Sequence, residues 1–187
     1  HQYHDTYNRL VAMRGGPDAL IYGGSQWVRG GDFSGLVSLL PFLEQDNRYR
    51  QIDWTAAIPP FIGAFEPWAA QLSVLSCPSD FAPGVRLNGC GYKSYHFSVG
   101  STINDNFWGS TNGAFGWRSY LRLGDITDGT SNTIAMAEKI MGAGDSQKVG
   151  GYSARLLGDV SLSPNICRDV ASSGSYRTGV LVSPMEQ

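Results

Sequence analysis

The residues best suited to bind a metal near the start of the chain are His1 and His4, with Asp5 beside them. Imidazole and carboxylate groups are common metal ligands, but a site also needs a third ligand and supporting hydrogen bonds. The same residues fit the polar side of a helix whose other side carries Tyr3 and Tyr7. The helix is the preferred interpretation, and no metal site is predicted here.

A second cluster, Asp125, Asp128 and Asn132, offers the hard oxygen ligands that Ca²⁺ prefers. Its spacing is not that of an EF-hand loop. Asp128 is followed by Gly129, which is typical of a tight turn whose polar side chains bond the local backbone. We therefore predict a turn, with Ca²⁺ as the alternative. No other cofactor is expected.

The chain has three cysteines, Cys77, Cys90 and Cys167, without the Cys-x-x-Cys spacing of a zinc or redox motif. Cys77 and Cys90 flank a stretch that contains proline and glycine. In an oxidising compartment a disulfide between them would contribute about 2–4 kcal/mol. The alternative is that all three are buried thiols.

Catalytic motifs are missing from the sequence. It has no Gly-x-Ser-x-Gly elbow, no His-Glu-x-x-His motif and no phosphate-binding glycine loop. Ser94, His96 and Ser98 are spaced two residues apart, so in an ordinary strand they lie on the same face. The chain is therefore predicted not to be an enzyme.

Two tryptophans, Trp108 and Trp117, lie in a region rich in asparagine and glycine. Exposed indole rings in such a loop could stack on the faces of sugars. The alternative is that the rings anchor the loop to the core. Both tryptophans are candidate glycan contacts.

The hydrophobic pattern predicts the elements that position these residues. Apolar residues at i, i+4, i+7 and i+8 predict a helix over residues 1–14 that ends at Gly15 and Gly16. Further predictions are a strand at 26–29, short helices near 41–51 and 67–76, and a mostly antiparallel sheet from about 92 to 183. The sequence therefore predicts an α+β fold with long loops.

Composition excludes several classes of protein. The chain has 187 residues, of which 16% are charged and 12% aromatic, with 24 glycines and a net charge of −2. This argues against a basic nucleic-acid binder and against a disordered chain. No apolar run is long enough to cross a bilayer. The low charge favours a surface that faces neighbouring proteins or glycans.

Three groups of residues together resemble one family. They are residues 1–7, residues 39–45 with 77–80, and residues 125–134, and the Asn112–Phe115 turn also fits. In identity and order they resemble the prepilin-type proteins abundant in planctomycete bacteria, and the matches run from residue 1 to about 138. The His-x9-Asp-Gly signature of many members is absent, because Asn106 stands where aspartate would follow His96. The tail from 140 to 187 is expected to lie outside the resemblance.

The resemblance implies a pilin-like or pseudopilin-like protein with a cleaved leader and a hydrophobic N-terminal helix packed on an antiparallel sheet. On this view residues 1–14 end that helix, and residues 15–187 form a single globular head. The implied location is extracellular or in the cell envelope, with the membrane reached only through an upstream helix. The expected partners are copies of the chain or other pilin-like subunits. The alternative function is a secreted module that binds glycans or another surface partner.

Overall fold

The computed structural model describes residues 1–16, 19–22, 25–29, 33–52, 54, 69–80, 91, 93–101, 111–139, 152–154, 171–172, 175–176 and 182–184. The chain divides into two compact units. The first includes His1–Ala70 and Phe97–Ala137, and the second includes Gln71–Leu87, Gly91–His96 and Glu138–Gln187. This division does not test the prediction of a single head over residues 15–187. Within the described residues, no helix is long and apolar enough to span a membrane.

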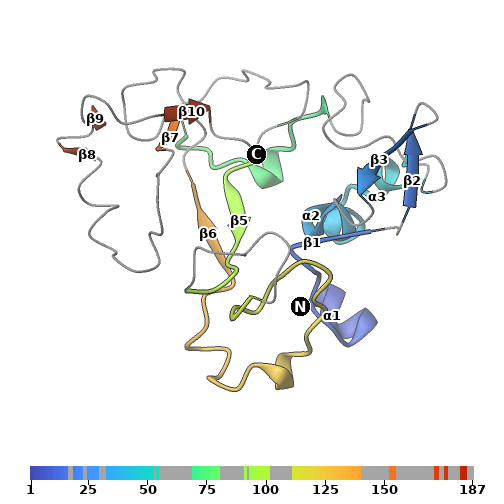
Figure 1. The fold of residues 1–187 in the computed structure, drawn as a ribbon. Coiled ribbons are helices and arrows are strands. Elements are labelled where there is room, and N and C mark those ends of the chain that lie inside the picture. Colours follow the sequence, from blue (N-terminus) through green and yellow to red (C-terminus); the bar gives the residue numbers. More distant parts are fainter. Residues whose placement is uncertain are drawn as a thin grey trace. The chain divides into compact units, whose positions relative to one another are not determined.

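The helices and strands are short and mixed in order, which agrees with the predicted α+β class (Figure 1). The first unit contains α1 (Gln2–Tyr7), β1 (Arg14–Gly15), β2 (Ala19–Tyr22), β3 (Ser25–Arg29), β4 (Phe33–Ser34), α2 (Gly35–Leu39), the 3-10 helix η1 (Leu40–Leu43), α3 (Asp46–Tyr49) and the 3-10 helix η3 (Leu123–Asp125). The second contains the 3-10 helix η2 (Ser73–Leu75), β7 (Tyr152–Ala154), β8 (Ala171–Ser172), β9 (Ser175–Tyr176) and β10 (Val182–Pro184). Strands β5 (Tyr95–Phe97) and β6 (Met136–Glu138) each have residues in both units.

Helix α1 is shorter than predicted. It ends at Tyr7 because Asn8 adopts the left-handed conformation, with φ of 52°. The chain then leaves the helical path, and the amide of Leu10 donates to the carbonyl of Leu121 at 2.6 Å. The helix predicted over residues 1–14 is therefore wrong beyond Tyr7. A pairing with a segment far away in sequence replaces the last helical turns.

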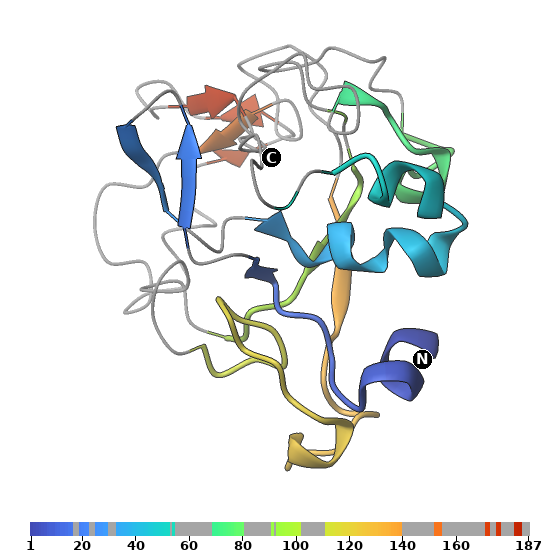
Figure 2. The same cartoon turned by 90° about the vertical axis from the view of Figure 1, so that its right-hand side faces the viewer.

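The helix predicted near 41–51 is part of a longer helical stretch formed by α2, η1 and α3 (Figure 2). It begins at Gly35, where the hydroxyl of Ser34 accepts a hydrogen bond from the amide of Leu36 at 3.3 Å. This is the usual role of serine at a helix N-cap. Glu44, with φ of 60°, interrupts the stretch. Of the helix predicted at 67–76, residues 67–68 lie outside the described residues, Ala69 is helical, and η2 follows after an extended Leu72.

The described strands form five two-stranded sheets, β1–β4, β2–β3, β5–β6, β7–β10 and β8–β9. Their pairing is antiparallel, as in Gly15 with Phe33 and Val182 with Ala154. The predicted antiparallel pairing is confirmed, but one continuous sheet over 92–183 is not found among the described residues. Strand β5 is kept short because the amide of Ser94 bonds the carbonyl of Leu75 instead of a neighbouring strand.

The buried apolar side chains among the described residues all belong to the first unit. One core cluster contains Val11, Ala114 and Phe115, and the ring of Phe97 lies 4.8 Å from that of Phe115. Gly35 allows close packing near this cluster, since a β-carbon there would meet the backbone carbonyl of Ala12. The other buried apolar side chains in the unit are Ala12, Phe33, Leu36, Leu40 and Ile52.

Candidate functional site

One face of α1 carries an aromatic patch formed by Tyr3, Tyr7 and Phe42. The ring centroids of Tyr3 and Tyr7 lie 4.7 Å apart, and Phe42 of η1 lies 5.5 Å from Tyr3 and 6.2 Å from Tyr7. Tyrosines at i and i+4 share a helix face, which explains the contact. No residue of α1 is buried, and Tyr7 is 54% exposed. The three rings of the patch therefore contact one another, while the ring of Tyr7 is also exposed to solvent.

The phenol groups near the patch influence one another. Burial raises the pKa of Tyr3, and the neighbouring phenols of Tyr120, Tyr7 and Tyr49 raise it further, while Arg9 lowers it. Tyr120 is itself exposed. Burial also raises the pKa of Tyr49, so the phenols of Tyr3 and Tyr49 are uncharged at neutral pH. The patch can therefore contact an uncharged surface by ring packing and hydroxyl hydrogen bonds.

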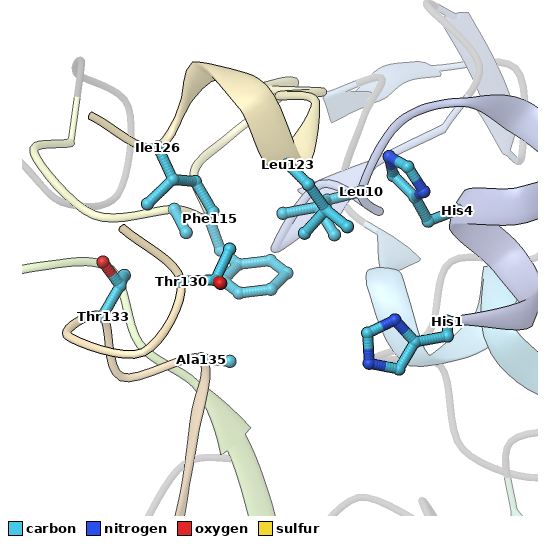
Figure 3. Close-up of a pocket in the computed structure, with 10 residues that line it drawn as sticks. His1, His4, Leu10, Phe115, Leu123, Ile126, Thr130, Thr133 and Ala135 are labelled. Atoms are coloured by element: carbon cyan, nitrogen blue, oxygen red, sulfur yellow. The ribbon is translucent and has the colours of Figure 1, made fainter. Parts of the chain in front are cut away.

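A pocket of about 270 Å³ lies beside α1 in the first unit. Two segments form it, α1 with the residues that follow it and the 114–135 region that contains η3, and these are neighbours in Figures 1 and 2. Figure 3 shows His1 and His4 across the pocket from Thr133. Its apolar walls are formed by Leu10, Ala114, Phe115, Leu123, Ile126 and Ala135.

The chemistry of this pocket favours apolar groups. Its polar members are two imidazoles and the hydroxyls of Thr130 and Thr133, and the Thr133 hydroxyl already donates to the carbonyl of Gly129 at 3.1 Å. The ring of His4 lies 3.8 Å from the carboxylate of Asp5. The pocket's lining residues include no acid and no thiol. Its mostly apolar lining is suited to a small apolar group.

Sequence reasoning found only part of this site. The spacing of Tyr3 and Tyr7 correctly predicted one helix face. Ile126 and Thr130 lie within the segment of the turn predicted from Asp125, Asp128 and Asn132, and both also line the pocket. Nothing in the sequence pattern links them to His1, because the contact depends on how two distant segments pack.

The predicted turn at Asp125, Asp128 and Asn132 is confirmed. The Asp125 carboxylate accepts a hydrogen bond from the amide of Arg122 at 2.8 Å, and the Asn132 side chain donates to the carbonyl of Asp128 at 3.0 Å. These are local bonds of the turn type. Over the part of the chain that the structure describes, no three metal-ligating side chains group together. Ca²⁺ binding by these residues stays a prediction.

The predicted disulfide cysteines and glycan-contact tryptophans are only partly covered by the described residues. Cys77 is a free cysteine whose sulfur lies 3.1 Å from the hydroxyl of Ser79. Cys90 and Trp108 lie outside the described residues, so the disulfide and that glycan contact stay predictions. Trp117 is half-buried, and the Arg118 guanidinium lies 5.1 Å from the centre of its ring. Its role in glycan contact also stays a prediction.

Comparison with known proteins gives one clear match. The family model described as "Protein of unknown function (DUF1559)" matches residues 1–180. The chain belongs to the DUF1559 family. No curated protein and no solved structure matches it significantly. The family match includes the aromatic patch, the pocket and most of the tail, and so extends beyond residue 138. The extent of the resemblance to prepilin-type proteins stays a prediction.

Proposed function

We propose that this DUF1559 protein is a structural subunit of an extracellular assembly of the type IV pilin or pseudopilin kind. The observation that carries the proposal is the exposed aromatic face of α1, where Tyr7 is 54% exposed and no helix residue is buried. The resemblance of residues 1–7, 39–45 and 125–134 to prepilin-type proteins supports the same function. The partners are copies of this chain or related subunits, outside the cytoplasm or in the cell envelope.

An exposed aromatic face is physically suited to assembly. Aromatic side chains bury a large area and lose little conformational entropy, so they are frequent at the centres of protein interfaces. The rings of Tyr3 and Phe42 hold Tyr7 in place before any partner arrives. A preordered contact surface lowers the entropic cost of association.

Other exposed apolar side chains of the first unit add to the area available for contact. Ile134 is 69% exposed, and Tyr120 and Met136 are also exposed. Single exposed apolar residues are normal on protein surfaces, so these residues do not carry the proposal alone. They become significant only if association with a second subunit covers them.

The proposal can be tested by replacing the most exposed ring of the patch in the native organism. Tyr7→Ser removes an aromatic contact that the fold itself buries only in part, so the subunit should still fold. We expect the amount of this chain recovered in high-molecular-weight material sheared from cells to fall by about tenfold, the loss expected from one interface hot spot. The readout is an immunoblot of sheared and cell-bound fractions.

The matched control is Val74→Ser, which replaces an exposed apolar residue of the second unit. It should leave the sheared fraction unchanged. Equal recovery of wild-type, Tyr7→Ser and Val74→Ser chains in that fraction would overturn the proposal. So would the absence of wild-type chain from any surface assembly.

A further inference from the structure

The second unit brings together three basic side chains. The chain has only three lysines, and two of them, Lys93 and Lys139, meet here together with His96. The amide of Lys139 donates to the carbonyl of Ser94 at 2.7 Å, which places the backbone of Lys139 beside Ser94, the residue that follows Lys93 in sequence. The His96 side chain is hydrogen-bonded to the backbone of Lys93. Residues far apart in sequence thus form one basic cluster.

The backbone around this cluster is fixed by hydrogen bonds. Ser94 has no exposed surface, and its amide donates to the carbonyl of Leu75 at 2.8 Å. Its hydroxyl accepts a hydrogen bond from the amide of Cys77 at 2.9 Å. Together with the bond from Lys139, these interactions join three segments at one buried serine. The basic side chains therefore extend from a defined framework.

The electrostatics of the cluster are unfavourable without a counter-charge. Like charges that lie close together repel each other. Burial lowers the pKa of Lys93, and the charge of Lys139 lowers it further. Burial also lowers the pKa of Lys139, while burial and both lysines lower the pKa of His96 to about 4. Among the described residues, no ion pair joins either lysine to a carboxylate.

We propose that Lys93, His96 and Lys139 form a binding site for a sulfate or phosphate group, either free or carried as an ester on a polysaccharide. Two ammonium groups match the two negative charges of free sulfate and exceed the single charge of a sulfate ester, and all three side chains can donate hydrogen bonds to the oxygens of either. Binding would remove the repulsion within the cluster. The site does not depend on the proposed assembly, because all of its residues belong to one unit of one chain.

The experiment is a calorimetric titration of the purified chain with sodium sulfate, at an ionic strength held constant with sodium chloride. We expect saturable binding, weakened about tenfold by Lys93→Met and by Lys139→Met, because each change removes one charged donor. Lys93→Arg keeps the charge and should retain most of the affinity. Arg122→Gln, which removes an exposed charge from the first unit, should change nothing.

The stability of the variants and the pH dependence of the affinity give two further tests of the site. The methionine variants should be at least as stable as the wild type without sulfate, because they relieve repulsion, so misfolding would not explain a loss of binding. Affinity should rise between about pH 7 and about pH 5, because a bound anion favours the protonated imidazole. No saturable binding, or unchanged binding in the Lys93→Met/Lys139→Met double variant, would overturn the proposal.

A second arm identifies the source of the anion. The same chain is titrated with a sulfated oligosaccharide and with its desulfated counterpart. Much tighter binding of the sulfated sugar than of free sulfate would identify an esterified glycan as the ligand class. Equal affinity for the two would identify the free ion. Either identification holds only if Lys93→Met and Lys139→Met weaken binding of the ligand concerned.

Discussion

The described parts of the two compact units are held together by different means. The first unit buries Val11, Phe33, Leu36 and Phe115, among other apolar residues, and orders its surface by ring contacts. In the second unit, the buried residue among those described is the polar Ser94. Hydrogen bonds of its backbone and its hydroxyl join its own segment to the segments of Leu75–Cys77 and of Lys139. Apolar burial gives the first unit a surface suited to packing, whereas the second unit presents charge on a polar framework.

This difference leads to different functional expectations. An apolar core with half-exposed tyrosines favours contact with another protein surface. A hydrogen-bonded framework that carries Lys93 and Lys139 favours a charged ligand. We therefore propose that one chain assembles through its first unit and binds an anion through its second. The predictions below test whether the two units depend on different forces.

The largest effect is expected from Phe115→Ala in the first unit. Phe115 is buried in the core cluster and contacts the ring of Phe97, so truncation leaves a cavity. We expect a loss of about 3–5 kcal/mol in the free energy of unfolding, measured by denaturant titration. Val74→Ala, at an exposed position, should change it by less than about 0.5 kcal/mol. A loss at Phe115 as small as that of the control would contradict the assigned core.

A smaller, local effect is expected from Ser94→Ala in the second unit. The change leaves the amide of Cys77 without its acceptor, which costs about 1–2 kcal/mol. We expect the Cys77 amide to exchange its hydrogen about tenfold faster, as measured by NMR. Ser73→Ala, at an exposed serine of η2, is the control. Unchanged exchange at Cys77 would show that Ser94 does not hold this unit together.

The smallest effect is the pH dependence contributed by His96. Its pKa falls from 6.5 to about 4 on folding, so the unfolded chain binds more protons between these values. The free energy of unfolding should therefore decrease as the pH falls from about 6.5 to about 4. Because His96 is only half-buried, we expect its share to be below about 1 kcal/mol. His96→Gln should flatten this part of the profile, measured without multivalent anions, and an unaltered profile would contradict the burial of His96.

Local patterns in the sequence predicted local structure well. The strand at 26–29, the helical stretch around residues 41–51 and the turn at 125–132 all depend on spacing and turn chemistry within a few residues. The end of α1 could not be predicted in this way, because the pairing of Leu10 with Leu121 overrides the helical pattern. The pocket and the basic cluster join residues far apart in the chain. Composition and spacing carry no signal for such contacts.

The central claim, that this DUF1559 protein builds an extracellular assembly, is tested most directly by electron microscopy of surface material from the native organism. Gold-labelled antibodies against the purified chain would locate it. The account predicts labelled filaments or shorter helical polymers, with regular labelling along their length that is strongly reduced in Tyr7→Ser cells. Label found only on dispersed single heads, or only inside the cells, would contradict the account.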